Sequence, residues 1–242
     1  MVIDDVGYNK ARGERAINLP GPVTIAVLPF APHTKPLVEY AGLLGKDVIV
    51  HQPMEPVASP HAREERGTLK LAMAGDAFDA ELARALDAVP ARIGLSNHTG
   101  SLLTAHRAPM RKLMKALSSR DLFFLDSRTS AQTVALDVAR ELGVPSLKRD
   151  VFLDHDRSPA AVHAAFEEAL TRARQQGHAV LIGHPYKVSL DYLHDRLAEL
   201  PADIDLVSAA ALARRQTNPE LRRPVVLARP PGLVSPHISP AQ

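Results

Sequence analysis

Short runs of apolar residues recur along the chain with polar, helix-like stretches between them. These runs are almost continuously hydrophobic rather than alternating, which is typical of parallel strands buried on both faces. Val2 and Ile3 look like the end of one such strand. We predict six further strands at residues 23–30, 47–51, 92–98, 122–126, 150–154 and 179–184.

The stretches between several of these strands have the apolar spacing of helices. We predict helices at residues 77–89, 110–118, 134–142 and 159–176. Gly143 and Gly177 stand just past the ends of two of them, where a glycine commonly caps a helix. This alternation of strand and helix predicts one α/β domain with a parallel sheet, either open or closed into a barrel.

The end of the chain has a different composition. From about Asn218 it is rich in proline and arginine. We therefore predict a single domain over residues 1–214 and an extended or disordered tail over residues 215–242.

Composition and charge exclude several classes of protein. The 242 residues are 45% hydrophobic with a net charge of +2, which is ordinary for a soluble globular domain. Because lysine and arginine are scattered rather than clustered, we expect no nucleic-acid partner. No apolar run has the length of a membrane span. The chain has no cysteine, so any metal must be held by histidine, aspartate or glutamate.

Nearly every predicted strand ends in a polar residue that can titrate or bind a metal. Because the carboxyl ends of parallel strands meet at one rim, residues far apart in the sequence should converge there. Each residue alone has a simpler explanation, such as a helix cap or a structural hydrogen bond. Together they predict a functional site. The residues are Asp4, Asp5, His51, His98, Asp126, Asp154 and His184.

Residues near these strand ends extend the prediction. Arg128 stands two positions beyond Asp126, so we expect its guanidinium to hold that carboxylate or to contact a substrate. His33, just past the strand at 23–30, either touches a ligand or caps a helix. Pro53 and Pro185 follow two of the histidines, and we expect each proline to end its strand.

The adjacent carboxylates of Asp4 and Asp5 need an explanation, because two like charges at a buried strand end repel each other. Water would screen the charges in a surface loop. A bound cation would also make the pair tolerable.

Seven motifs give the chain a resemblance to a known family. They are, in order, VIDDVG, VTIAVLPFAPHT, VIVHQPMEP, IGLSNHTGS, LFFLDSRT, RDVFLD and LIGHP. In this order they resemble the divergent polysaccharide deacetylases, an offshoot of the carbohydrate esterase superfamily that carries the NodB domain. The resemblance implies a distorted (β/α) barrel of about seven strands. It also implies a metal-dependent hydrolase that removes acyl groups from N- or O-acylated carbohydrate. The alternative is a catalytically weak or inactive envelope protein with a binding or scaffolding role, which keeps the fold and possibly the metal.

The resemblance assigns roles to individual residues. Asp4 matches the catalytic base of the superfamily, and Asp5 matches a metal ligand. The well-studied members add two histidines four residues apart, but here Glu55 stands four residues after His51. We expect the second imidazole to come from His98, with Glu55 as the competing ligand.

The last two motifs supply the remaining roles. His184 matches the general acid, and Asp154 either orients a catalytic histidine or binds sugar hydroxyls. One carboxylate and two imidazoles leave open positions on a metal, as in catalytic zinc sites, so zinc is the expected cofactor.

Two further expectations concern substrate and location. Aromatic residues make up only 4% of the chain, so we expect a small acylated substrate or a single sugar unit rather than a long polymer. Tyr186 is a candidate to stack on a sugar ring. Family members usually enter the cell envelope through an N-terminal signal. We see none here, so we infer an extracytoplasmic location only from the resemblance. Because the chain begins abruptly, just before the carboxylates, we expect an N-terminal segment to be missing.

Overall fold

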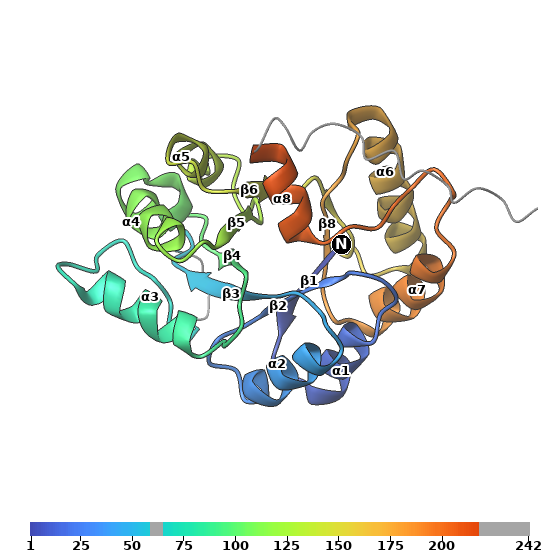
Figure 1. Ribbon diagram of the computed structural model, residues 1–242, viewed down its shortest axis with the longest axis horizontal. Helices are drawn as coiled ribbons and strands as arrows, with labels where there is room; N and C mark the ends of the chain where they lie inside the picture. The colour runs from blue at the N-terminus through green and yellow to red at the C-terminus, as the bar shows by residue number, and fades with distance from the viewer. Residues whose placement is uncertain (59–64, 218–242) are drawn as a thin grey trace, which may run out of the picture.

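The strands form one parallel sheet that is curved into a half-barrel (Figure 1). The computed structural model describes residues 1–58 and 65–217. The strand order is β6-β5-β4-β3-β2-β1-β8-β7, and every neighbouring pair is parallel. The strands are β1 (Val2–Val6), β2 (Thr24–Val27), β3 (Val48–Met54), β4 (Gly94–Thr99), β5 (Phe123–Asp126), β6 (Ser146–Lys148), β7 (Val151–Phe152) and β8 (Leu181–Gly183).

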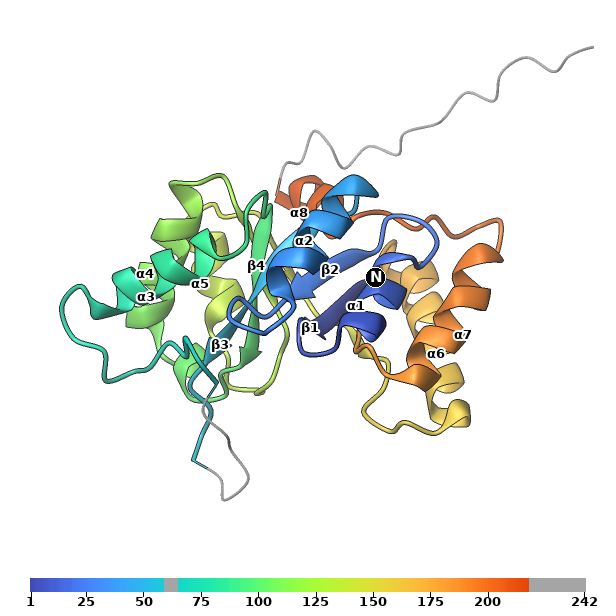
Figure 2. The ribbon, with the colours of Figure 1, turned by 90° about the horizontal axis from the view of Figure 1, so that it is seen from below.

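Helices follow most of the strands and cover the outer face of the sheet. Figure 2 shows α3, α4 and α5 beside one end of the sheet and α6 and α7 beside the other. The helices are α1 (Lys10–Ile17), α2 (Thr34–Leu43), α3 (Ala77–Asp87), the 3₁₀ turn η1 (Leu103–Ala105), α4 (Arg107–Ser118), α5 (Ala135–Glu141), α6 (Pro159–Gln176), α7 (Lys187–Ala198) and α8 (Ala209–Thr217).

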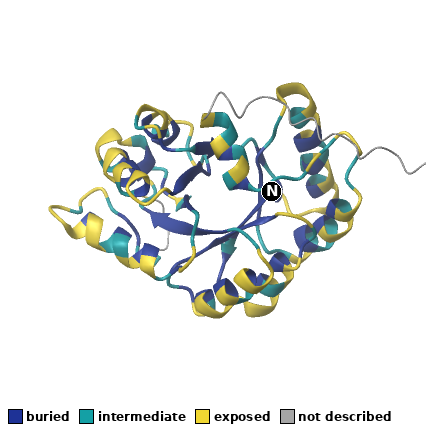
Figure 3. Ribbon diagram, viewed as in Figure 1, coloured by how far each residue is buried: buried dark blue, intermediate teal, exposed yellow. Residues whose placement is uncertain are grey.

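Both faces of the sheet are buried, as the continuous apolar runs predict (Figure 3). Ile25 and Val27 of β2 belong to the large core between the sheet and the outer helices. Their neighbour Ala26 belongs to a second, smaller core on the inner face. Ala209 and Ala213 of α8 pack into that inner core. The half-barrel is therefore filled by side chains at the level of these residues.

The expected barrel-like α/β fold is confirmed, with differences at particular elements. The sheet has eight strands because the three-residue strand β6 adds to the expected seven. Pro53 does not end its strand, since β3 continues through it to Met54. The Pro53 carbonyl still accepts a hydrogen bond, from the N–H of Leu69 at 2.9 Å. By contrast, β8 ends at Gly183, ahead of Pro185.

The predicted helix at residues 159–176 has the same limits in the structure. Its N-terminus is capped by Ser158, whose side chain accepts the N–H of Ala161, and Gly177 ends it with a φ of 78°. At the end of the chain, α8 continues to Thr217, past the expected domain limit at Arg214. The remainder of the predicted tail lies outside the described residues. In the described part of the chain, no helix is both long enough and apolar enough to cross a membrane.

Candidate functional site

Four strands bring their carboxyl ends together at one rim of the half-barrel. His51 on β3 lies beside Ser96 on β4, and β1 pairs with β8 so that Ile3 lies beside Gly183. Asp4 and Asp5 therefore lie close to His184, the residue after β8. The convergence expected from the sequence is present in the structure.

Backbone distortion turns both adjacent carboxylates toward this rim. Successive side chains on a regular strand point to opposite faces of the sheet, so Asp4 and Asp5 would normally diverge. The pairing of β1 with β2 shifts in register between Ile3 and Val6, and Asp5 has a φ of 57°. A left-handed conformation in a residue other than glycine costs about 1–3 kcal/mol and commonly marks a functional site.

Asp5, His51 and His98 form a compact group of three metal-competent ligands. Asp5 Oδ1 lies 3.2 Å from His51 Nε2 and 2.8 Å from His98 Nδ1. The two nitrogens are 3.3 Å apart. In a tetrahedral zinc site with bonds of about 2.0 to 2.1 Å, the ligand atoms lie about 3.3 Å from one another. These separations fit one small cation shared by the three atoms.

The surroundings of Asp5 also fit a cation. Its Oδ1 is buried and accepts no hydrogen bond of ordinary geometry from the part of the chain that the structure describes, although two ring nitrogens lie close to it. Burial opposes the charge on Asp5, but the imidazoles of His51 and His98 outweigh burial and hold the pKa of that carboxyl well below its usual range. Asp5 is therefore ionised, as a metal ligand must be.

Asp4 lies next to this group and is more deeply buried than Asp5. Its side chain is almost fully buried, and its Oδ2 is 3.6 Å from His51 Nε2. Its Oδ1 is buried and has no hydrogen-bond partner among the described residues. Burial raises the pKa of Asp4. The charge of His51 lowers this pKa and the charge of Asp5 raises it, so that the net effect is a raised pKa. A carboxylate with a raised pKa and a free oxygen is a stronger proton acceptor than an exposed one.

His184 stands on the other side of Asp5 and is oriented by Asp154. Its Nδ1 is 2.8 Å from Asp154 Oδ1, and its Nε2 is 3.7 Å from Asp5 Oδ2. Asp154 Oδ2 accepts the backbone N–H of His184 and the hydroxyl of Ser189. Burial lowers the pKa of His184, but Asp154 and the nearby Asp5 outweigh burial and raise it. Of the two roles expected for Asp154, the structure shows contact with the histidine.

Two residues at the site were not expected from the sequence. Ser96 Oγ lies 2.7 Å from His51 Nδ1, which leaves His51 Nε2 to face the carboxylates. Arg149 bonds the carbonyls of Ser127 and Arg128, and its charge acts on Asp4. Neither residue ends a predicted strand, so the strand-end rule did not select them.

Other predicted residues lie outside the three-ligand group. Glu55 Oε2 accepts the N–H of Leu71 at 2.7 Å, so the structure does not place it with the other ligand atoms. His33 occupies the N-cap position of α2 without a side-chain cap bond. Its backbone N–H donates to the Gly7 carbonyl, which ties this turn to the loop after Asp5.

The expected contact between Arg128 and Asp126 forms differently from the prediction. The backbone N–H of Arg128, rather than a guanidinium group, donates to Asp126 Oδ1 at 2.8 Å. Thr133 donates its hydroxyl to Oδ2. Asp126 is buried at the end of β5, and burial raises the pKa of its carboxyl. A φ of 52° at Arg128 turns the backbone toward Asp126.

The comparison with known sequences identifies the family. The sequence pattern of the divergent polysaccharide deacetylases matches residues 1–213. The chain belongs to the divergent polysaccharide deacetylase family. It is 35% identical over 212 residues to the uncharacterized protein YibQ of Escherichia coli K12, covering 88% of this chain and 66% of YibQ. It is 38% identical over 216 residues to an uncharacterized protein of Haemophilus influenzae, covering 89% of this chain and 76% of that protein.

This member of the family also resembles a solved structure. The crystal structure of the uncharacterized protein ATU2773 from Agrobacterium tumefaciens C58 superimposes with a TM-score of 0.83. The match covers 87% of each chain at 22% sequence identity, so it shows a shared fold. The chain spans just under two thirds of the length of YibQ, so part of that relative has no counterpart here.

Proposed function

We propose that this protein is a metal-dependent hydrolase that removes acyl groups from N- or O-acylated carbohydrate. The observation that supports this most is the group of Asp5, His51 and His98, flanked by two other titratable side chains. Asp4 and His184 approach the group from different strands and are not needed as ligands. A metal site alone would not require a buried base on one side and an oriented imidazole on the other.

Asp5, His51 and His98 would hold the metal, and zinc suits their two nitrogens and one oxygen. When bound, zinc supplies a Lewis acid for the acyl carbonyl and lowers the pKa of a water molecule. Ser96 keeps the ring of His51 in the orientation that binding needs.

The chain's own residues account for the proton transfers. Asp4, whose Oδ1 is free, accepts a proton from the water that attacks the acyl carbon. His184, held at Nδ1 by Asp154, presents Nε2 to the site and donates a proton to the leaving nitrogen or oxygen. The carbon–nitrogen or carbon–oxygen bond breaks, which releases a carboxylic acid and the free amine or alcohol.

Tyr186 lies beside His184, within reach of a sugar bound at this site. Its ring stacks on His184 with a centroid separation of 5.5 Å, and the guanidinium carbon of Arg157 lies 3.8 Å from the Tyr186 ring centroid. Because aromatic residues make up only 4% of the chain, we propose a substrate of one or a few sugar units in the cell envelope, rather than a long chain.

The test combines metal analysis with a deacylation assay. Bound metal is quantified in the purified chain, and acetate release is measured on N-acetylated and O-acetylated sugars of one to four units. Asp4→Asn is expected to keep its metal and to lose about 10²- to 10⁴-fold in rate. His194→Ala is the matched control, because His194 is exposed and its Nδ1 lies 3.2 Å from its neighbour Asp195, away from the three ligand residues.

The same experiment separates an enzyme from a binding protein. If the fully metal-loaded wild type releases no acetate from any of these sugars, the hydrolase proposal is wrong. Sugar binding without turnover would then favour the inactive envelope protein.

A further inference from the structure

Two cavities lie side by side at the amino ends of the strands, on the opposite end of the sheet from Asp4 and His184. One has a volume of about 300 Å³ and the other about 660 Å³. They share four lining residues, which are Gly177, His178, Leu212 and Arg215. The two cavities therefore adjoin one another.

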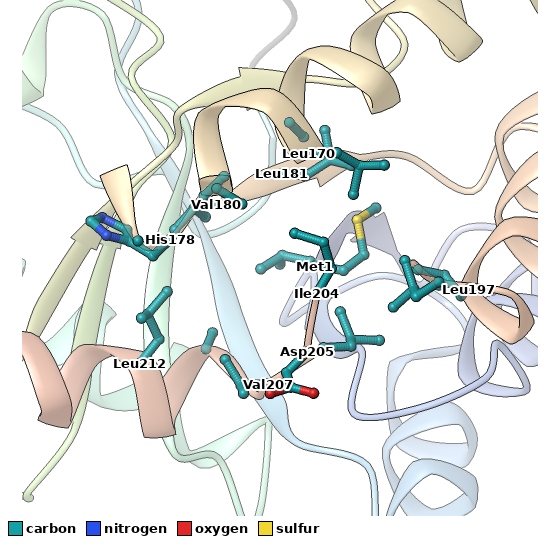
Figure 4. Close-up of a pocket in the computed structure, with 18 of the residues that line it drawn as sticks. Met1, Leu170, His178, Val180, Leu181, Leu197, Ile204, Asp205, Val207 and Leu212 are labelled. Carbon is teal, nitrogen blue, oxygen red and sulfur yellow. The ribbon is translucent and has the colours of Figure 1, made fainter. Parts of the chain in front are cut away.

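The smaller cavity is mostly apolar (Figure 4). Leu170 of α6, Leu181 of β8 and Leu197 of α7 surround it together with Ile204. Two carboxylates also reach its lining. Asp203 is neutralised by Arg174, whose Nε lies 2.8 Å from the Asp203 carboxylate. Figure 4 shows that Asp205 lies apart from His178, a residue that lines both cavities. This lining suits a hydrocarbon chain.

The larger cavity is cationic. Arg140 of α5, Arg215 of α8 and His178 line it, and none of the described residues in its lining is acidic. Neither Arg140 nor Arg215 has an ion-pair partner in the part of the chain that the structure describes, whereas the adjacent Arg214 pairs with Asp121 at 3.5 Å. Two unpaired guanidinium groups beside an apolar cavity suit an anionic head group, because arginine binds carboxylates through paired hydrogen bonds.

We propose that this groove, defined by Arg140, Ala173, His178 and Arg215, binds a single-chain amphiphile with a carboxylate head, of the medium-chain fatty acid type. The hydrocarbon chain occupies the smaller cavity, and the carboxylate lies between Arg140 and Arg215. A volume of about 300 Å³ is at the lower end of the range for small-molecule sites, so it suits one chain and not a two-chain lipid.

Calorimetric titration of the full chain with decanoate, below the concentration at which it forms micelles, tests the head-group contact. One molecule is expected to bind per chain. The double variant Arg140→Gln and Arg215→Gln is expected to bind at least tenfold more weakly. Arg214→Gln is the matched control and is expected to bind like the wild type, because Arg214 lines neither cavity. Equal binding by all three proteins would overturn the proposal.

A second pair of measurements tests the chain and the charge. Ala173→Phe places a large ring in the smaller cavity, which Ala173 lines, and is expected to weaken decanoate binding at least tenfold with little change in melting temperature. Decyl maltoside has the same chain and a neutral head, and it is expected to bind at least tenfold more weakly than decanoate.

Two results would overturn the proposal in different ways. Equal affinity for decanoate and decyl maltoside would show that the arginines do not select the ligand. No binding of decanoate, with dimers that form as the protein concentration rises, would make a second copy of this chain the better occupant. His51→Ala is expected to bind decanoate like the wild type. A failure of the proposed decanoate site can therefore be distinguished from a failure of the proposed hydrolase.

Discussion

His184 and Asp154 are joined twice, once through the ring and once through the backbone. His184 Nδ1 lies 2.8 Å from Asp154 Oδ1, and the backbone N–H of His184 donates to Asp154 Oδ2 at 2.7 Å. The two bonds fix both the position and the rotation of the ring. They leave only Nε2 free to face the centre of the site.

This relationship makes the pH profile of hydrolysis depend on Asp154. A general acid acts in its protonated form, so the rate falls as pH rises through the pKa of His184. Asp154 contributes to the raised pKa of His184, so Asp154→Asn is expected to move this alkaline limb to lower pH. For each pH unit by which this limb moves, the rate at a given pH on the limb falls about tenfold.

The measurement for Asp154→Asn is the rate at saturating substrate between pH 5 and 10. Ser189→Ala is the matched control, because it removes only the hydroxyl that donates to Asp154 at 2.6 Å and keeps the carboxylate. A smaller displacement is expected for that variant. An unchanged limb in Asp154→Asn would mean that His184 is not the acid.

Metal binding should depend on His51 and not on Glu55. His51→Ala removes one of three grouped ligand atoms, so stoichiometric zinc is expected to be lost while circular dichroism stays that of the wild type. Glu55→Ala is the control, because that carboxylate bonds the backbone of Leu71 instead. Full zinc in His51→Ala, or none in Glu55→Ala, would show that the ligands are wrongly assigned.

The sequence predicts the long, regular parts of this fold well. Continuous apolar runs identify the central strands because both faces of a parallel sheet are buried. The limits of α6 could be predicted because Ser158, Pro159 and Gly177 supply start and stop signals. Strand β6 was missed because three residues carry too little pattern. The helices α1, α2, α7 and α8 were also not predicted.

The parts of the candidate site that are set by strand ends could be predicted from the sequence. The parts that are set by local backbone conformation could not. His51, His98 and His184 follow from the rule that parallel strands end at one rim. The orientation of Asp5 does not, because regular alternation would turn it away from Asp4, and only the bulge and its positive φ reverse this. Ser96 and Arg149 act through contacts that residue spacing does not reveal.

The turn after His98 is expected to be sensitive to a single methyl group. Gly100 has a φ of 93°, and a Cβ there would lie 2.8 Å from the Cβ of Met54. Gly143 also has a positive φ, of 68°, but a Cβ there would meet nothing within 4 Å. Alanine at either position carries backbone strain of about 1–2 kcal/mol. Only Gly100→Ala adds overpacking, which typically costs about 1–3 kcal/mol more.

Urea unfolding of Gly100→Ala and Gly143→Ala measures the difference between these two costs. Gly100→Ala is expected to be the less stable by about 1–3 kcal/mol. It should also weaken zinc binding, because Gly100 follows His98 by two residues. Equal stability of the two variants would mean that the Met54 side chain moves aside with no loss in the free energy of unfolding.

The choice of leaving group separates the role of His184 from that of Asp4. An amine leaves poorly unless it is protonated, whereas the phenolate of an activated aryl ester leaves without a proton. His184→Ala is therefore expected to lose about 10²- to 10⁴-fold in rate on an N-acetyl sugar and much less on an aryl acetate. Asp4→Asn removes the acceptor for the proton of the attacking water, a step that both substrates share, so both rates should fall together.

The measurement is the rate on both substrates for wild type and both variants, with bound zinc quantified in each. Equal losses on the two substrates in His184→Ala would mean that this histidine acts before the leaving group departs, and that the donor of the proton is another residue.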